Sequence, residues 1–360
     1  YGYPSSDQAF TTGLEFDTRR MDIPVGRLSA NTIAEVLAYL AKVQATEAQP
    51  PAIWQKNILH FAGGFSPQEV NNMAGWLGSL AAIATDTAAY LGGNVITFKK
   101  LGSDVIVQAS ADSVRHYVED QGVTLMTFLA HAYSASFDIT IDEPENYDWN
   151  GKHPVILGNS CYIGNFHGNG ATSASERWVL MPDAGPIAFI AAAEQGFTGW
   201  LLNYSSPFYD SFARVNHGGS IGEHMKHAGL TCQVLSPTSY MAWNVQNFSL
   251  QGDPTITLNS HRQPDYTVSA DRILIEPANV TADVDSFTVK VAVENIGRAV
   301  NAVINVELKR SNPGLGANPV SYFTTLSDVD LRDTAVFRVP TLGFSGGQGT
   351  NQLQVLVDLE

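Results

Sequence analysis

A cysteine and a histidine stand at the ends of two strongly apolar segments of this sequence. Cys161 follows the segment 154–160 (PVILGNS), and an apolar run of this length, begun by a proline and ended by small residues, predicts a buried parallel strand. His131 ends a second apolar run, residues 123–130. Because open α/β sheets place their functional groups at the carboxyl ends of strands, neighbouring strands would bring the thiol and the imidazole together. A cysteine and a histidine so placed are the minimum equipment of a cysteine nucleophile.

Each of the two residues also has a structural interpretation. Buried cysteine often packs as a small hydrophobic residue, and a histidine at the end of a core strand can simply have its hydrogen bonds satisfied. The small residues before Cys161 allow a sharp turn, and Ala130 and Ala132 leave room for a substrate backbone beside His131. These neighbours favour the catalytic interpretation. A single possible partner, Cys232, makes no disulfide framework in 360 residues, so we expect Cys161 to be a free thiol.

Acyl transfer also needs hydrogen-bond donors for an oxyanion. The backbone N–H groups of Cys161 and Ala132 can supply them, because both residues lie where the predicted strands end. An acid that orients His131 would help but is not obligatory. Glu69 is a candidate orienting acid, although its position also suits a helix cap. Two further acids lie just past the histidine, Asp138 and Asp142.

Three other histidines raise the question of a metal site: His217, His224 and His227. Their spacing fits no standard zinc pattern, so we expect them on the surface of a helix. No cofactor is expected for the chemistry of Cys161 and His131, and a structural calcium ion is left open.

The composition limits the classes of partner. The net charge is −15, from 35 acidic and 20 basic residues, and no basic block is present, which argues against nucleic acid or an anionic membrane surface as partner. No apolar stretch approaches the roughly 18 residues that a membrane-spanning helix needs. Charged residues make up only 15% of the chain, a surface style that favours an exported protein.

Strands and helices alternate over residues 1–260, which predicts a mostly parallel sheet covered by helices on both faces. Thr32 and Glu35 form a capping box at the start of one helix. We expect that helix to pack on the sheet through its apolar face: Ile33, Val36, Leu37, Leu40 and Val43. A second helix begins at Ser66 with a proline in its first turn, and a third is expected over residues 110–120.

The pattern changes at about residue 261. From there to residue 360, short alternating segments recur at roughly ten-residue spacing with turn residues between them, the rhythm of a β-sandwich. The chain opens without the basic start or apolar core of a signal peptide, and its last residues alternate like a strand and stop without a turn. We therefore expect a piece of a longer protein.

Several segments together resemble a known family. They are the segment 25–30 (VGRLSA) with the helix containing Glu35 and Lys42-Val43, the FLAH segment ending at His131, the GNSCYIGNF segment 158–166, Ser175-Glu176 and Gly252-Asp253-Pro254. In order and spacing these are similar to the gingipain-like C25 cysteine peptidases, over residues 15–260. The segment around the cysteine is the most specific part of the match.

The resemblance implies a caspase-like α/β catalytic domain, residues 1–260, followed by an immunoglobulin-like domain, residues 261–360. It implies that Cys161 is the nucleophile and His131 the acid/base, and that the first part of the family's catalytic unit is largely missing upstream. Two positions depart from the pattern. Ala132 stands where gingipains have glycine, and Phe65 stands near the place of the acid that assists the histidine.

These observations predict a secreted cysteine endopeptidase, located on the extracellular side of the outer membrane, with a protein or peptide substrate. A sortase-like transpeptidase of type IX secretion would use the same machinery with an amine in place of water. The hypothesis from a different class is an inactive adhesion or assembly module. In that case Phe65 and Ala132 would be substitutions that accompanied the loss of activity. Other domains of the same longer chain, or secretion-system components, are the expected partners.

Overall fold

The chain divides into two compact units, residues 1–260 and residues 261–360. The structure, a computed structural model, describes residues 5–14, 20–101, 108–139, 141–168, 172–259, 261–312, 315, 318–343 and 349–358. The interpretation of the two chain ends rests in part on residues 1–4 and 359–360, which lie outside the described residues.

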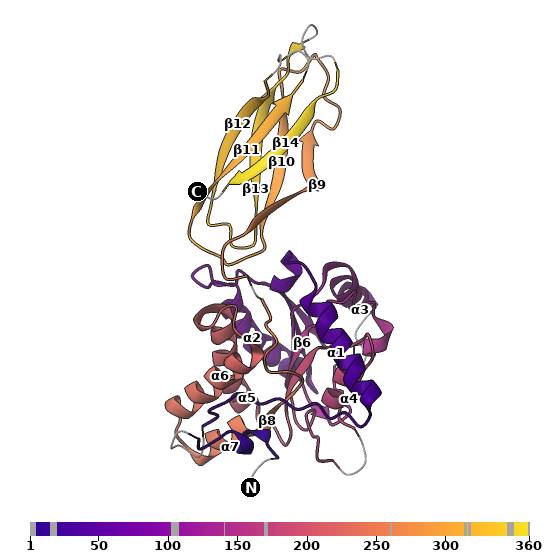
Figure 1. Cartoon of the computed structure of the whole chain (residues 1–360), viewed down its shortest axis with the longest axis vertical. Helices are drawn as coiled ribbons and strands as arrows, with labels where there is room; N and C mark the ends of the chain where they lie inside the picture. The colour runs from indigo at the N-terminus through magenta and orange to yellow at the C-terminus, as the bar shows by residue number, and fades with distance from the viewer. Residues whose placement is uncertain are drawn as a thin grey trace. The chain divides into compact units, whose positions relative to one another are not determined.

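A six-stranded sheet forms the centre of the first unit (Figure 1). Neighbouring strands are parallel except for the last, which runs antiparallel to its neighbour. The two middle strands are buried along their whole length, as expected for a sheet covered on both faces. In spatial order the strands are β2 (Asn94–Lys99), β1 (Asn57–Ala62), β3 (Leu125–Leu129), β6 (Val155–Asn159), β7 (Ala188–Ala192) and β8 (Phe248–Gln251).

Helices cover both faces of this sheet (Figure 1), and each layer has its own apolar core. One layer contains α2 (Pro67–Ala84), α5 (Thr198–Asp210), α6 (Ile221–Leu235) and α7 (Ser239–Asn247). The other contains α1 (Ile33–Glu47), α3 (Gln108–Arg115) and α4 (Ala174–Leu180). The mostly parallel, doubly covered sheet predicted for this part of the chain is therefore confirmed.

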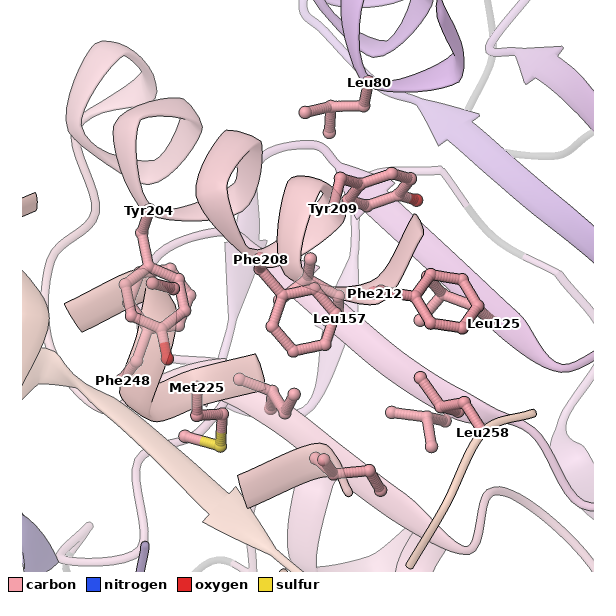
Figure 2. Packing of buried hydrophobic residues seen from close by; sticks show 14 of the residues in the cluster. Leu80, Leu125, Leu157, Tyr204, Phe208, Tyr209, Phe212, Met225, Phe248 and Leu258 are labelled. Atoms are coloured by element: carbon pink, nitrogen blue, oxygen red, sulfur yellow. The ribbon is translucent and has the colours of Figure 1, made fainter. Parts of the chain in front are cut away.

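Helix α5 is held firmly against the middle of the sheet. Figure 2 shows Phe208 of α5, and Phe212 of the π-helical turn that continues it, among the buried side chains that pack with Leu125 and Leu157 of the sheet. Both rings are at most 1% exposed, and burying such a side chain contributes roughly 1.5–3 kcal/mol. Because α5 is anchored in this way, the loop that precedes it has a fixed position above the carboxyl ends of the strands.

Buried hydrogen bonds add to this anchoring. The Tyr209 hydroxyl of α5 lies 2.8 Å from Nε2 of His60 and 2.6 Å from Oγ1 of Thr127, on β1 and β3. One turn earlier, the Ser205 hydroxyl donates to Oδ1 of Asn159 on β6, at 2.6 Å. A buried polar group costs free energy unless it is paired, so these bonds also set the register of α5 along the sheet.

The expected packing of α1 is wrong. Four residues of its predicted inner face are exposed, with exposed fractions of 44–79%: Ile33, Val36, Leu37 and Leu40. The helix instead turns Tyr39 and Lys42 into the protein, and only Val43 of the predicted face packs against the cores. The capping box of Thr32 and Glu35 is present as predicted. The spacing of the apolar residues predicted the helix correctly, but it did not predict which side of the helix faces the sheet.

Lys42 explains why α1 turns this way. Its side chain is 1% exposed, and its ammonium group donates to four backbone carbonyls at or just after the end of α4. The acceptors and the distances from Nζ are Val179 (2.8 Å), Ala184 (2.8 Å), Met181 (3.2 Å) and Trp178 (3.5 Å). The last carbonyls of a helix lack partners within the helix and attract a cation. One buried lysine therefore joins α1 to α4.

Replacing Lys42 by methionine is expected to lower the free energy of unfolding by about 2–4 kcal/mol, because it leaves several buried carbonyls without a donor. The matched control is Lys99→Met, since Lys99 lies exposed on β2 and its ammonium group donates to Oδ1 of Asn71 at 3.3 Å. That change should stay within about 0.5 kcal/mol. Urea unfolding of both variants measures the difference, and equal midpoints would contradict the role assigned to Lys42.

The remaining elements of the first unit are short. A short β-hairpin follows β3, and the sequence did not indicate it. Its two strands have two residues each, β4 (Ala132–Tyr133) and β5 (Ser136–Phe137). The helix expected over residues 110–120 is α3 followed by the π-helical turn His116–Gln121. The other short elements are a second π-helical turn, Ser211–Val215, and the 3₁₀ turns Asp7–Phe10, Ile53–Lys56 and Pro144–Asn146.

The second unit contains two antiparallel three-stranded sheets that share one apolar core. The first sheet consists of β13 (Arg332–Pro340), β10 (Ser286–Asn295) and β9 (Tyr266–Glu276), and the second of β12 (Val320–Ser327), β11 (Val303–Ser311) and β14 (Gln352–Asp358). Buried and exposed residues alternate along β10 and β11, as sandwich strands require. The predicted all-β unit is present, and its immunoglobulin-like character stays a prediction.

Candidate active site

The register of the two middle strands brings His131 and Cys161 to one edge of the sheet. β3 and β6 are parallel neighbours, and Leu129 pairs with Asn159. His131 and Cys161 each follow the paired residue by two positions, so they leave adjoining strands at the same level. Beyond the strand ends, the Ser160 hydroxyl donates to the carbonyl just before His131 at 2.6 Å, which keeps the two segments together.

The two side chains also lie on the same face of the sheet. His131 contacts Glu69 in the first turn of α2, and Cys161 contacts Gly196, two residues before α5. Helices α2 and α5 belong to the same layer. The structure therefore places the imidazole and the thiol at the amino-terminal ends of two helices on one side of the sheet.

Glu69 has two functions in the local structure. One carboxylate oxygen, Oε1, lies 2.8 Å from Nε2 of His131, and the other accepts the backbone N–H of Phe65 at 2.7 Å. The N–H of Glu69 donates to the Ser66 hydroxyl at 3.2 Å, which caps α2. These contacts hold the pKa of Glu69 below its ordinary value of 4.5, first through the Phe65 N–H and then through His131. A carboxylate that remains ionised in moderate acid thus faces the imidazole.

Phe65 covers one face of the imidazole. Its ring stacks on that of His131 with centroids 4.0 Å apart and planes 10° apart, while 74% of Phe65 remains exposed. The Lys100 ammonium lies 6.0 Å from the centroid of the Phe65 ring. Phe65 therefore restricts the orientation of the imidazole, although it carries no acid itself.

The two acids just past the histidine have other partners. Asp138 accepts the backbone N–H of Gly64 at 2.9 Å and pairs with Lys100 at 3.2 Å, which holds the loop that carries Phe65. Asp142 pairs with Arg115 at 2.5 Å. Of the three acids considered from the sequence, Glu69 is the one that reaches the imidazole in the described part of the chain.

Cys161 is a free thiol, as expected. Its sulfur lies 3.4 Å from both the backbone nitrogen and the carbonyl oxygen of Gly196. The following residue, Tyr162, has a φ of 57°, a left-handed conformation that non-glycine residues adopt rarely and often at functional sites. The other cysteine, Cys232, is buried in α6, and burial raises the pKa of its thiol to about 12. The two thiols therefore differ strongly in environment.

Backbone donors are present near the sulfur. The amides on either side of Cys161, in Ser160 and Tyr162, donate to backbone carbonyls, whereas no acceptor for the Cys161 N–H is found among the described residues. Ala132 pairs with Phe137 in the hairpin, and beside this pair the N–H of Asp138 donates to the carbonyl of His131 at 2.7 Å. Since hydrogen-bonded and non-hydrogen-bonded pairs alternate in antiparallel strands, the Ala132 N–H points away from its partner. Both donors proposed from the sequence are thus available.

Sequence reasoning missed Gly196 and the stacking of Phe65 on the imidazole. Gly196 follows β7, the next strand of the sheet after β6, so the rule that sites lie at carboxyl ends of strands was the signal that could have found it. Beside Gly196 lies an aromatic cluster with ring centroids 4.9–6.4 Å apart: Phe197, Trp200, Tyr240 and Trp243.

No group of three potential metal ligands is found among the described residues. The expectation that three histidines lie on a helix surface is wrong for His217, which lies in a turn before α6. It is also wrong for His224, which is 0% exposed and bonds to the Ser211 hydroxyl through Nδ1 at 3.0 Å. Burial lowers the pKa of His224 to about 3. Among the described helices, none has the length and apolar character that crossing a lipid bilayer requires.

Comparison with known proteins identifies the family. The model of peptidase family C25 matches residues 1–259, and no curated protein sequence matches the chain. The fold is similar to that of the Arg-specific cysteine proteinase gingipain R, at 13% identity and a TM-score of 0.58, over 98% of this chain and 76% of that one. The complex of the pro- and mature domains of Porphyromonas gingivalis RgpB gives 14% identity and a TM-score of 0.58, over 98% and 80%.

A further structure, described only as a protease, gives 12% identity and a TM-score of 0.59, over 93% of this chain and 78% of that one. At such identities these likenesses concern the fold, and they agree with the caspase-like arrangement predicted for residues 1–260. The family model covers more than half of the chain. The chain therefore belongs to peptidase family C25, and it is a gingipain-like cysteine peptidase.

Proposed function

We propose that the chain is a secreted endopeptidase in which Cys161 is the nucleophile and His131 the acid/base. The observation that carries this proposal is the register of β3 and β6, which sends both residues to one edge of the sheet. Two contacts support it: the carboxylate of Glu69 bonds to the imidazole of His131, and the backbone N–H of Gly196 donates to the sulfur of Cys161. The low share of charged residues, 15%, supports the extracellular location.

In the proposed reaction the Cys161 thiolate attacks a peptide carbonyl carbon, and a C–S bond forms. The N–H groups of Cys161 and Ala132 hold the resulting oxyanion. The C–N bond then breaks as His131 gives its proton to the leaving amine. Water next attacks the thioester carbon and transfers a proton to His131. The C–S bond then breaks, which releases the acid product and restores the thiolate of Cys161 and the imidazolium of His131.

Glu69 is proposed to position His131. Because Nε2 faces the carboxylate, Nδ1 is the nitrogen that exchanges a proton with the thiol and the leaving group. A buried aspartate in the same role is worth about 10⁴-fold in serine proteases, but the Glu69 side chain is 34% exposed. Solvent screens a pair at this exposure, so a smaller effect is expected here.

Replacing Glu69 by glutamine is expected to lower kcat about tenfold to a hundredfold with little change in KM, because the imidazolium loses its ionic partner. The matched control is Glu35→Gln, since Glu35 caps α1 through the same backbone pattern but contacts no histidine. Steady-state kinetics of both variants separate positioning from capping. Equal activity of the two variants would mean that Glu69 is only a cap.

The pH dependence of Glu69 follows from its lowered pKa. An acid whose folded-state pKa is depressed stabilises the folded state fully above its unfolded value, near 4.5, and the contribution is lost as the pH falls through the lower folded value. The contact with His131 is therefore kept at neutral pH. Activity at neutral pH should not depend on the titration of this carboxyl.

A peptide library tests the proposal as a whole. The full chain is incubated with peptides of varied sequence, alone and with a small primary amine, and products are read by mass spectrometry. Endopeptidase activity gives new carboxyl ends, whereas transpeptidase activity gives amine adducts at the same bonds. If no peptide bond is cleaved and no adduct forms, while the chain remains folded, the inactive assembly module is the better interpretation.

A further inference from the structure

A buried arginine lies in the core of the second unit. Along β11, the inward-facing positions are Ile304, Val306 and Leu308, all at most 1% exposed, and the next position in this series is Arg310, 3% exposed. An arginine thus occupies a place where the alternation of the strand calls for an apolar residue. Buried charges in proteins are normally paired.

Arg310 has hydrogen bonds but no acidic partner. Nε donates to Oδ1 of Asn351 at 2.8 Å, and Nη1 donates to the backbone carbonyl of Pro340 at 2.6 Å. The guanidinium carbon lies 5.3 Å from the centroid of the Phe287 ring. Within the described residues, no Asp or Glu oxygen lies within ion-pair distance of this side chain. Two of its five N–H donors are therefore used by neutral groups, and no acid of the described residues compensates its charge.

The same side chain lines a cavity of about 170 Å³. The cavity lies between the two sheets, because its walls include Ile275 and Phe287 from one sheet and Arg310 and Leu353 from the other. Apolar side chains form much of the wall, and the polar groups besides the arginine are Thr281, Thr341 and Asn351. An apolar cavity of about 150 Å³ accepts a molecule of the size of benzene.

From these features we propose that the second unit binds a carboxylate attached to a small apolar group, as in the carboxyl-terminal residue of a peptide that ends in an aliphatic or aromatic side chain. The carboxylate pairs with Arg310, whose planar guanidinium suits bidentate contact with a carboxylate. The apolar group fills the space between the sheets. The Thr281 hydroxyl bonds to Asp283 and the Thr341 hydroxyl donates to the Val284 carbonyl, so each hydroxyl oxygen can still accept the N–H of the adjoining amide.

Other anionic ligands fit less well. A phosphate group is usually held by several cationic or backbone donors, whereas Arg310 is the one lysine or arginine among the described residues of this wall. A long acyl chain needs more volume than 170 Å³. The cavity belongs to the second unit, whereas Cys161 and His131 belong to the first, and the inference does not depend on the proposed function.

Binding to the full chain tests the inference with three probes: N-acetyl-leucine, N-acetyl-leucinamide and decanoate. Titration calorimetry and saturation-transfer NMR should show N-acetyl-leucine binding with a Kd of about millimolar, the range for so small a ligand. The amide, which lacks the charge, should bind at least tenfold more weakly. Decanoate should also bind more weakly, since its chain exceeds the cavity.

Three variants locate the site. Arg310→Met should weaken binding of N-acetyl-leucine at least tenfold, while Lys309→Met, on the outward side of the same strand, should leave it unchanged. Because the loss of Arg310 can unfold this unit, Ala282→Leu provides a second test, since it fills the cavity with the arginine in place.

The inference is overturned if the wild-type chain binds the acid no better than the amide, or fails to bind the acid at 20-fold the expected Kd. It is equally overturned if Ala282→Leu binds as tightly as the wild type. Tighter binding of decanoate than of N-acetyl-leucine would replace the peptide terminus by a lipid as the ligand and so would contradict the proposal as stated.

Discussion

Replacing Cys161 by alanine is expected to abolish peptide-bond cleavage, with kcat/KM lower by about 10⁴-fold or more, because covalent catalysis then has no nucleophile. The substitution should leave the fold intact. The side chain is only partly buried, and its described contacts are with the backbone of one residue, Gly196. Progress curves for a peptide selected from the library, with circular dichroism of the same samples, measure both expectations.

The matched control for this variant is Cys232→Ala. Cys232 is 3% exposed and its thiol donates to the carbonyl of Asn203, so it plays no part at the edge of the sheet. We expect this variant to be slightly less stable and fully active. Cleavage that survives in Cys161→Ala, or that disappears in Cys232→Ala while the chain stays folded, would show that the nucleophile lies elsewhere.

Replacing His131 by alanine has the second largest expected effect, a fall in kcat of about 10³-fold to 10⁴-fold. Without the imidazole, no described side chain beside Cys161 takes the thiol proton or supplies one to the leaving amine, and general acid–base catalysis contributes about 10²–10⁴-fold. Steady-state rates of the variant and of the wild type, measured on the peptide selected from the library, test this expectation.

His116→Ala is the control for that variant. His116 also contacts a carboxylate, Oδ2 of Asp120, at 2.7 Å, but it lies on the π-helical turn after α3 and away from the carboxyl ends of β3 and β6. Its activity should equal that of the wild type. A loss of the same size in both variants would indicate a general effect of removing a histidine on the protein, and would argue against the proposed role of His131.

The sequence was sufficient to predict the sheet and the placement of its two central residues. Apolar runs of strand length, alternating with helices, imply parallel strands with right-handed crossovers, and the ends of two such runs at His131 and Cys161 followed directly. That β3 and β6 are neighbours was an assumption, since strand order depends on contacts between segments far apart in the chain. The structure confirms it.

Contacts that depend on three-dimensional packing could not be predicted in the same way. Glu69 was recognised as a helix cap and only as one candidate for the orienting acid. The spacing of residues within α2 does not show how that helix is placed relative to His131. Gly196 is distant from Cys161 in the sequence and offers only backbone atoms. Its contact with the sulfur arises from the anchoring of α5 on the sheet.

Helix α1 shows a different limit. Hydrophobic periodicity assumes that the apolar face is the buried one, but here a single lysine with four carbonyl acceptors outweighs it. Lys42 was part of the family resemblance, but its burial was not predicted, since a lysine in a helix is usually exposed. Arg310 in the second unit is similar: it occupies a buried position on β11, although an arginine is rarely buried.

The proposed pairing of Cys161 with His131 can be measured directly through the rate at which iodoacetamide alkylates each cysteine at pH 7. The account predicts fast labelling of Cys161 and very slow labelling of Cys232, whose burial raises its thiol pKa to about 12. It also predicts that His131→Ala slows labelling of Cys161 about tenfold, because thiolate formation then lacks its neighbouring base, while His116→Ala does not. Labelling of Cys161 that is unaffected by His131→Ala, or equally slow labelling of both cysteines in the wild type, would contradict the account.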